Sequence, residues 1–252
     1  MNHRDESTSL LIYGRNPLIE ALREHQPIEK IYLLHHLKGG KIDFISREAR
    51  RRGIPVTRVD RRKLESLTGA VNHQGVAAII SPVTTLDLDT FLDQLRDVDH
   101  PPCVVMLDRI QDPHNMGAIL RSSEFLGADG VIYSPRENVP LNETVIKTSA
   151  GALFHLLICK VSNLVQAIQR LKEEDYWIYG SHVNSTTPLW TVDFTRKCVI
   201  VIGNEEHGMR PLVEKNCDQL FFIPRIGKTN SLNASVAAGI ALAECLRQRQ
   251  KQ

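Results

Sequence analysis

The sequence lacks the features that mark several large classes of protein. Its 252 residues contain five cysteines, an odd number, and no C-x-x-C pair, which excludes a disulfide-rich miniprotein and a zinc knuckle. No apolar run approaches the roughly 18 residues that a membrane helix requires, and the first ten residues, MNHRDESTSL, are polar and of mixed charge. Reduced thiols without a membrane span favour a soluble protein of the cytoplasm.

Two common enzyme classes are also disfavoured. No G-x-G-x-x-G motif follows an apolar strand, as the dinucleotide-binding fold of an NAD enzyme requires. The histidines form no set with metal-ligand spacing, so we expect no metal site and no metal-dependent hydrolase. His114 and His207 lie near two of the loops considered below, and we assign them incidental polar roles.

Positive charge is concentrated in the first third of the chain. Residues 1–80 hold 14 Lys and Arg against 9 Asp and Glu, an excess of +5, whereas the remainder carries −3. Most of the excess lies in the segment SREARRRGIPVTRVDRRK, which contains Arg47, Arg50, Arg51, Arg52, Arg58, Arg61, Arg62 and Lys63. Such a cluster suits a nucleic-acid backbone and equally the solvated face of a helix. The cluster alone leaves both interpretations open.

The length and pattern of the chain predict two domains. Residues 8–80 alternate short helical and strand-like segments, which together favour one small α/β layer fold. The stretch SPVTTLDLDTFLDQLRDVDHPP begins with a proline turn, continues with an acidic amphipathic segment and ends in Pro-Pro. We therefore predict an N-terminal domain at 1–80, a linker at 81–101 and a second domain at 102–252.

The second domain has the pattern of a mostly parallel sheet covered on both faces. Its short apolar runs, CVVMLD, GVIYS, WIYGSHV, CVIVIG and QLFFIP, alternate with helical patterns, as in α/β proteins. Ligands of such sheets bind where the carboxyl ends of the strands meet the following loops. Three of these loops have unusual sequences.

The loop after CVVMLD leads into a helix with one small side and a single arginine. We expect this helix from about Met116 to Leu126, ended by Gly127 as its C′ residue. Asn115 at its start suits an N-cap. Arg121 lies among apolar neighbours, from which an arginine either extends its charge to solvent or grips a phosphate with two hydrogen bonds.

The loop after CVIVIG reads GNEEHGMRPLV. Gly203 and Gly208 have the glycine spacing of a Walker A loop, but Met209 replaces its lysine and two glutamates occupy the phosphate cradle. Because carboxylates repel phosphates, binding of a nucleoside triphosphate is disfavoured. The loop suits a hydroxyl, an amine or a cationic ligand, and by itself it is equally an ordinary tight turn.

The third loop, which follows QLFFIP, reads RIGKTNSLNASVAAGIALAECL. Ser231 or Asn233 can cap a helix that carries small residues at helical spacing, namely Ala234, Ala237, Ala238 and Ala241. A small face permits close approach of a backbone, a ligand or a second subunit. Taken alone, this segment is a buried helix with a cap.

Together the three loops resemble one known family. The motifs N-x-G-x-x-x-R (Asn115 to Arg121), G-N-E-x-x-G (Gly203 to Gly208) and S-L-N-x-S-V-A-A-G (Ser231 to Gly239) look like the three motifs of the SpoU/TrmH family. They occur in the family's order and spacing over residues 103–246. The family consists of S-adenosylmethionine-dependent RNA ribose 2′-O-methyltransferases within the SPOUT superfamily. One such motif is weak evidence, whereas three in order are strong.

The N-terminal part resembles the substrate-binding domain of one subgroup of that family. The segments LIYGRNPLIEALRE and NHQGVAAI are similar to the small domain of enzymes that act on large-subunit ribosomal RNA. That domain is similar to ribosomal proteins that bind kinked RNA, which gives the arginine cluster a use. The resemblance thus implies a ribosomal RNA partner, with a guanosine in the peptidyl-transferase region of 23S RNA as the first candidate.

Alternatives to that substrate and activity stay open. A uridine or adenosine of the same RNA is the second candidate, followed by a nucleotide of another ribosomal RNA or of tRNA. A non-catalytic RNA-binding protein of the same fold is the alternative from a different class. The motif residues Asn115, Arg121, Glu205 and Asn233 are all present, which favours the enzyme, because a binding protein has no need of them.

The resemblance also implies a fold, an assembly and a set of site residues. The family fold is an α/β domain whose C-terminal region forms a deep trefoil knot that holds the cofactor, and its members are homodimers with the active site near the interface. The polar active-site positions implied are Asn115, Arg121, Glu205, Ser231 and Asn233, and the backbone positions that hold S-adenosylmethionine are Gly203, Ile223 and Leu232. Arg225 stands where the family usually has methionine.

The main task of such an enzyme is to position the ribose 2′-hydroxyl against the methyl group. Methyl transfer from a sulfonium needs little acid catalysis, because the leaving thioether is neutral, so in-line positioning of the ribose 2′-hydroxyl dominates. A guanidinium with a pKa above about 12 is a poor base, so we expect Arg121 to bind the phosphate beside the target ribose.

Overall fold

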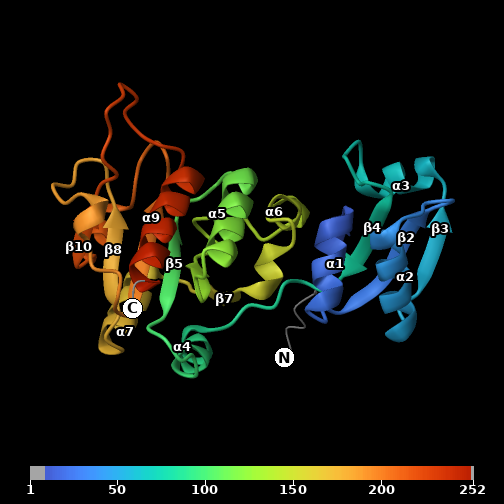
Figure 1. Cartoon of the computed structure of the whole chain (residues 1–252), viewed down its shortest axis with the longest axis horizontal. Helices are drawn as coiled ribbons and strands as arrows, with labels where there is room; N and C mark the ends of the chain where they lie inside the picture. Colours follow the sequence, from blue (N-terminus) through green and yellow to red (C-terminus); the bar gives the residue numbers. More distant parts are fainter. Residues whose placement is uncertain (1–8, 251–252) are drawn as a thin grey trace, which may run out of the picture. The chain divides into compact units, whose positions relative to one another are not determined.

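The computed structural model describes residues 9–250, which fold into two compact units (Figure 1). The first unit comprises the described residues up to Thr84 together with Leu141–His155. The second unit comprises Thr85–Pro140 and the described residues from Leu156 onward. No helix in the described part of the chain combines the length and apolarity needed to cross a membrane.

The first unit is built on a mixed four-stranded sheet in the order β1-β4-β2-β3. The strands β2 and β3 are parallel, whereas β4 is antiparallel to both β1 and β2. This confirms the small α/β layer expected from the sequence, although the strand LLIY was not predicted. Its elements are β1 (Leu10–Tyr13), α1 (Arg15–Arg23), β2 (Ile28–Leu34), α2 (Gly40–Arg51), β3 (Val56–Val59), α3 (Arg61–Thr68) and β4 (Val76–Ile80).

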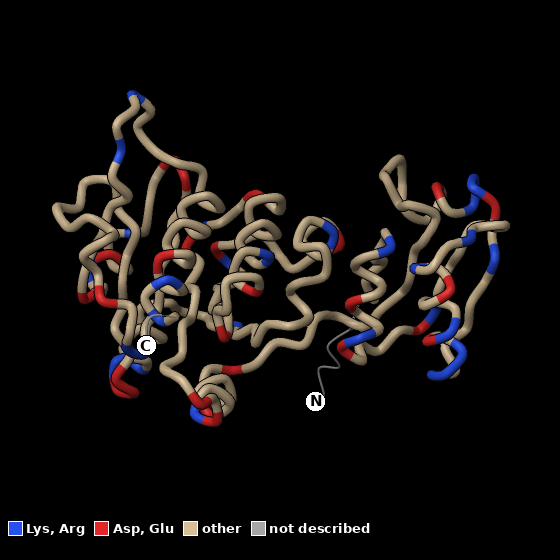
Figure 2. Tube along the Cα trace, viewed as in Figure 1, with Lys and Arg blue, Asp and Glu red and all other residues tan. Residues whose placement is uncertain are grey.

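The helices of this unit are amphipathic, as the periodicity of their sequences requires. In α2 the buried residues Ile42, Ile45 and Ala49 recur at helical spacing and share one face, which leaves the arginines on the other. Figure 2 shows Lys and Arg gathered along α2, β3 and the start of α3. Arg52 is an exception, because its guanidinium donates to the carbonyl oxygens of Leu22 at 3.1 Å and Gln26 at 2.8 Å.

Residues 141–155 pack on this same unit, although they come from the middle of the predicted second domain. They form α6 (Glu143–Thr148) and the short 3-10 helix η1 (Ala152–His155). The His155 ring lies 3.1 Å from the carboxylates of both Glu20 and Glu24 on α1 and just beyond its end. Lys147 Nζ lies 5.4 Å from the centre of the Tyr13 ring, and burial lowers the pKa of this ammonium.

The second unit is built on a parallel six-stranded sheet in the order β10-β8-β9-β5-β6-β7. This confirms the predicted α/β class, although the strand LICK was not predicted. Its elements are α4 (Leu88–Arg96), β5 (Cys103–Asp108), α5 (Pro113–Phe125), β6 (Gly130–Tyr133), β7 (Leu157–Lys160), α7 (Leu164–Glu173), β8 (Trp177–Ser181), η2 (Leu189–Thr191), β9 (Cys198–Gly203), α8 (Pro211–Lys215), β10 (Gln219–Phe221) and α9 (Ala234–Arg249).

One face of the parallel sheet is covered by α4 and α7. Phe91 and Leu95 of α4 and Ile168 of α7 pack with Met106 and Val201 of the central strands in one buried cluster. The helix α4 lies inside the segment 81–101 that the sequence analysis assigned to a linker. Its three apolar residues at helical spacing bind it to the core of the second unit, so most of that segment is folded.

The other face of the sheet carries α5 and α9, which lie side by side (Figure 1). Small residues line their contact, and a Cβ added to Gly239 would lie 3.8 Å from Ser122 Oγ. Arg249 fixes the end of α9, because its guanidinium donates to the carbonyl oxygens of Phe194 at 3.0 Å and Arg196 at 3.1 Å. The beginning of α9 is thereby held beside the beginning of α5.

The buried thiol of Cys159 predicts a loss of stability in alkali. Burial, with a smaller contribution from the Asp87 carboxylate, raises the pKa of Cys159 from 9.0 to about 12. A raised folded pKa contributes stability that is present below the unfolded pKa and is lost as the pH rises towards 12.

We therefore expect the free energy of unfolding to fall between pH 9 and 10.5 by about 1 to 2 kcal/mol on account of this thiol. The variant Cys159→Ala should show a smaller fall in the free energy of unfolding over this pH range. Urea denaturation of both proteins at pH 9 and at pH 10.5 measures this free energy. An identical slope in the variant would contradict the prediction.

Candidate active site

The first site element is the helix α5, which begins immediately after a buried strand end. Asp112 is its N-cap, and the Asp112 carboxylate accepts hydrogen bonds from the backbone N–H groups of His114 and Asn115, both at 3.2 Å. The predicted start at Met116 and the N-cap interpretation of Asn115 are therefore wrong. Proline at the first helical position extends the helix by three residues, because its fixed φ suits that position. Gly127, with φ +76°, confirms the predicted helix end.

Asn115, Glu205 and Asn233 form one hydrogen-bonded cluster. Asn115 Nδ2 donates to Glu205 Oε1, and Asn233 Nδ2 donates to Asn115 Oδ1 at 2.8 Å. Asn233 also caps α9, since its Oδ1 accepts from Ser235 N at 2.9 Å and from Ser235 Oγ at 2.6 Å. Asn115 lies in the first turn of α5, Glu205 in the loop after β9 and Asn233 at the cap of α9, so the three motifs meet at one place.

The loop that carries Glu205 is closed by its own backbone. Asn204 and Gly208 exchange two backbone hydrogen bonds of 3.1 and 2.9 Å, and Asn204 Oδ1 accepts from the N–H groups of Glu206 and His207. A Cβ on Gly203 would lie 2.5 Å from both Gly208 C and Met209 N. The missing side chain at Gly203 is thus required by the fold of the loop itself.

Two arginines outside the predicted set of site residues hold this loop against the end of β5. Asp108, fully buried, accepts hydrogen bonds from Arg210 N and Nε, both at 2.7 Å. Arg109, at φ +65°, donates from Nη2 to the Gly208 carbonyl oxygen at 3.1 Å, and its buried Nε has no partner among the described residues. In the sequence, only the acidic residue Asp108 at the end of an apolar strand could have indicated these contacts.

Arg121 and Ser231 lie outside the cluster. Arg121 is exposed and makes no hydrogen bond or ion pair within residues 9–250. At 3.6 residues per turn it lies about 120° around α5 from Asn115, next to the exposed ring of Phe125. Ser231 is exposed in the loop before α9, and its hydroxyl has no partner in the described part of the chain.

The long loop between β10 and α9 contains two of the three predicted cofactor positions (Figure 1). Ile223 is half-buried and Leu232 is exposed, and the backbone groups from 223 to 232 make no hydrogen bond to other described backbone. Arg225 closes the loop, donating from Nη1 to the carbonyl oxygens of Thr229 at 3.0 Å and Asn230 at 3.1 Å. Free backbone groups beside apolar side chains suit a ligand with an aromatic ring and polar edges.

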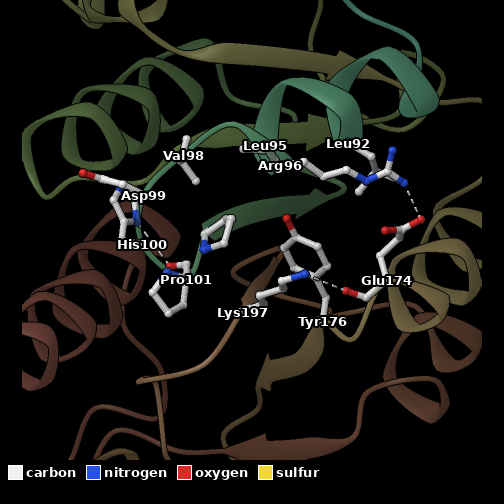
Figure 3. Close-up of a pocket in the computed structure, with 11 residues that line it drawn as sticks. Leu92, Leu95, Arg96, Val98, Asp99, His100, Pro101, Glu174, Tyr176 and Lys197 are labelled. Atoms are coloured by element: carbon white, nitrogen blue, oxygen red, sulfur yellow. Dashed lines mark hydrogen bonds and ion pairs between the residues drawn. The ribbon is translucent and has the colours of Figure 1, made fainter.

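Two other features of the second unit lie at the opposite edge of its sheet. A cavity of about 450 Å³ is lined by α4 and the segment that follows it, including Leu95 and His100, and by Tyr176 and Lys197, which directly precede β8 and β9 (Figure 3). The thiols of Cys103, Cys198 and Cys245 also meet there, within 4.8 Å of one another. Neither feature touches the loops that carry the cluster, so neither belongs to this site.

Comparison with known proteins identifies the family to which the chain belongs. Residues 102–243 match the SpoU rRNA Methylase family, which covers more than half of the chain. The chain belongs to this family. Residues 11–86 match the family described as RNA 2′-O ribose methyltransferase substrate binding. The resemblance to the family that was inferred from the three motifs is thus confirmed, and the chain is an RNA methyltransferase.

Individual relatives are similar to the chain over both of its units. A putative TrmH family tRNA/rRNA methyltransferase of Staphylococcus aureus (strain MSSA476) is 40% identical over 239 residues, 95% of this chain and 96% of the relative. The crystal structure of the SpoU methyltransferase AviRb from Streptomyces viridochromogenes is 25% identical with a TM-score of 0.82, covering 100% of this chain and 93% of that chain. The AdoMet-bound rRNA methyltransferase from Sinorhizobium meliloti is 25% identical with a TM-score of 0.79, covering 97% and 89%.

The close backbone approach at Gly203 predicts a large effect of one added methyl group. Gly203→Ala should lower the free energy of unfolding by about 2 to 4 kcal/mol, because the methyl overlaps backbone atoms that cannot rotate away. Gly208→Ala is the matched control, since its Cβ meets open space and only its φ of +63° costs about 1 kcal/mol. Urea denaturation measures both, and equal losses would contradict the argument.

The hydrogen bond from Asn115 to Glu205 predicts a pH-dependent effect of an isosteric change. Asn115→Asp replaces the hydrogen-bond donor to Glu205 with a second carboxylate, and two negative charges in contact repel each other. This repulsion is present where carboxyl groups are ionised and weakens in acid, so the deficit in the free energy of unfolding should be about 1 to 3 kcal/mol larger at pH 8 than at pH 4. Asn115→Ala should show the same deficit at both pH values, and parallel behaviour of the two variants would contradict the prediction.

Proposed function

We propose that the chain transfers the methyl group of S-adenosylmethionine to a ribose 2′-hydroxyl of ribosomal RNA, with a guanosine of 23S RNA as the first candidate. The observation that carries this proposal is the cluster of Asn115, Glu205 and Asn233, because it joins all three motifs in one place. The AdoMet-bound S. meliloti rRNA methyltransferase supports the cofactor and the substrate class. The S. aureus relative is named for both tRNA and rRNA, so tRNA is the second candidate.

The described residues fit S-adenosylmethionine in the loop between β10 and α9. Backbone groups near Ile223 and Leu232 are free to meet the polar edge of an adenine, and the side chains of both residues offer apolar contact to its ring. Gly203 contributes only backbone atoms at the end of the adjacent strand. These three positions would hold the adenosine, and the bound cofactor would supply an electrophilic methyl group with a neutral leaving thioether.

The protein's own contribution is the placement of the ribose. Alignment of two reacting groups lowers a barrier by roughly 7 to 11 kcal/mol when the geometry is good. The mutual hydrogen bonds of Asn115, Glu205 and Asn233 fix the positions of three polar side chains before RNA arrives, so no reorganisation is needed. With Ser231 from the neighbouring loop, they form the polar surroundings of the 2′-hydroxyl.

Arg121 acts as the phosphate anchor in this mechanism. Its guanidinium is exposed and has no protein partner within residues 9–250, so it is available for a two-bond contact with phosphate oxygens. Arg121 lies on a different side of α5 from Asn115, so it can contact a nucleotide that approaches the cluster from outside. It also suits a homodimer whose active site lies near the interface, with the exposed Phe125 beside it as an apolar contact.

The first unit selects the RNA. Arg50, Arg62 and Lys63 are exposed with no side-chain partner among the described residues, whereas Arg52 is bound to backbone carbonyls and Arg61 pairs with Glu65 at 2.7 Å. Part of the arginine cluster is therefore structural, and part is free for phosphates. Because the methyl acceptor is a 2′-hydroxyl, which DNA lacks, the substrate is RNA. We also propose that the protein is located in the cytoplasm and that its second unit contains the trefoil knot of the family.

The role of Arg121 predicts a selective kinetic defect. Arg121→Ala should reduce turnover on ribosomal RNA by at least about 100-fold while the Kd for S-adenosylmethionine stays within about twofold, since the side chain contacts only RNA. Arg196→Ala, an exposed arginine that precedes β9 at the opposite sheet edge, should change neither quantity. Single-turnover methyl transfer and calorimetry measure the two, and full turnover in Arg121→Ala would remove this residue from the mechanism.

The substrate is tested directly by the modification itself. Purified chain is incubated with labelled S-adenosylmethionine and unmodified transcripts of 23S, 16S and transfer RNA, and the labelled nucleotide is mapped by mass spectrometry. A 2′-O-methyl group blocks alkaline cleavage at its own linkage, because that cleavage needs the free hydroxyl. Label on a base would overturn ribose methylation, and cofactor binding without label on any RNA would favour the non-catalytic alternative.

A further inference from the structure

Three of the five cysteines of the chain meet at one point in the second unit. Cys103 and Cys198 are the first residues of the neighbouring strands β5 and β9, and the parallel register sets them opposite each other. Cys245 comes from α9, which packs on β9. The Sγ atoms of all three lie within 4.8 Å of one another. We call these three residues the three-thiol cluster.

The distances between the sulfur atoms suit a single bound metal ion. A thiolate sulfur lies about 2.3 Å from a bound ion such as Zn²⁺, so three sulfurs around one ion are about 3.8 to 4.0 Å apart. The Sγ atoms of Cys103 and Cys245 are 3.7 Å apart, which is already close to that separation. The other two pairs need to approach by no more than about 1 Å.

The three-thiol cluster differs from an ordinary buried cysteine. A single buried thiol, such as that of Cys159, packs as a small apolar side chain. In the cluster, three thiols converge from three elements, and Cys103 and Cys245 are 142 positions apart in the sequence. The prediction that the chain has no metal site was based on spacing along the sequence, which does not detect a set that only the fold assembles.

The cluster offers three sulfur ligands and no fourth ligand. Among the described residues, no histidine, aspartate or glutamate side chain joins the three thiols at a distance suited to a shared ion. Structural zinc sites have four protein ligands, and calcium and magnesium ions require oxygen ligands. Thiolates select soft ions. A soft ion that accepts three sulfur ligands, as Cu(I) does, therefore suits this set better than Zn²⁺.

One positive charge lies beside the cluster. Arg249 Nη2 donates to Cys198 Sγ at 3.5 Å, and the carbonyl oxygens of Phe194 and Arg196 hold the same guanidinium in place. Three thiolates around a monovalent ion leave a net negative charge, which is costly to bury without a counter-ion. The fixed guanidinium of Arg249 offsets part of that charge.

The cluster lies at the edge of the core, where an ion can reach it. Both strands begin at their cysteine, and Pro101 and Arg196, each two residues earlier, are exposed. Local opening at the start of two strands requires much less unfolding than access to the middle of a sheet. Hydrogen bonds with Cys198 and Cys245, together with burial, raise the pKa of Cys103 well above its ordinary value, so this thiol is protonated before an ion binds.

We infer that the three-thiol cluster binds one soft, thiophilic cation of low coordination number, such as Cu(I), through the Sγ atoms of Cys103, Cys198 and Cys245. The thiol protons leave to solvent as the sulfur–metal bonds form. The inference is independent of the proposed function, because neither RNA nor S-adenosylmethionine takes part. A bound ion would join β5, β9 and α9, the elements whose opposite ends lead to the loops of the candidate active site.

The test titrates the full-length protein with Cu(I) under argon. Ascorbate keeps the metal reduced, and the coloured chelator bicinchoninate competes for it. We expect the unaltered protein to withdraw one ion per chain from the chelator. Cys103→Ser, Cys198→Ser and Cys245→Ser should each lower the affinity by at least about 100-fold, because loss of a partner outside the ligand set already costs roughly 10- to 100-fold.

Cys159→Ser and Cys217→Ser are the matched controls. Each makes the same atomic change in the same unit, at a free thiol outside the cluster, and should keep the affinity of the unaltered protein. Circular dichroism establishes which variants are folded. X-ray absorption of the unaltered protein loaded with Cu(I) needs no variant, and it should show three sulfur neighbours and no nitrogen or oxygen neighbour.

Each outcome decides for or against the inference. A loss of affinity confined to the cluster variants, with three sulfur neighbours around the ion, supports it. Unchanged affinity in folded cluster variants overturns it, and so does a nitrogen or oxygen neighbour in the absorption spectrum. Equal losses in the control variants also overturn it, because thiols outside the cluster would then hold the metal. Failure to methylate any RNA overturns the proposed function without affecting this titration.

Discussion

The pairing of β5 with β9 is the constraint on which the site depends. The two strands run parallel at the centre of the sheet, in a register that sets Asp108 opposite Gly203. Parallel strands end at the same edge, so the loops that follow them must emerge together. Asp108 then binds Arg210 beyond the second loop, and this buried ion pair prevents the two loops from separating.

The third loop is brought to that edge by helix packing. The small residues of α5 and α9 let the two helices lie side by side, and Arg249 holds the far end of α9 against the sheet. Asn233 therefore reaches Asn115 from a point 118 residues later in the chain.

In the proposed function, the two units divide recognition from chemistry. The second unit has rigid, mutually bonded side chains at the carboxyl edge of its sheet, where a small displacement of a reacting atom costs much of the rate. The first unit has exposed arginines and lysines without a side-chain partner among the described residues, and these would suit the phosphates of an RNA. The segment 141–155 joins them covalently, because it leaves the second unit after Pro140, packs on α1 and β1, and returns at Leu156.

The sequence alone was enough to predict the α/β class, the family and the three loops, because apolar periodicity and the spacing of the motifs are local properties. The strands β1 and β7 were missed, since a run of four residues carries too little periodicity to distinguish a strand from a turn. The helix α4 was interpreted as part of a linker, because flanking prolines marked a boundary while its three apolar residues gave the weaker signal.

The sequence placed Asn115, Glu205 and Asn233 in one site by resemblance. Only the tertiary structure decided that they bond to one another while Arg121 lies apart, because contact between residues about 100 positions apart depends on sheet register and helix packing.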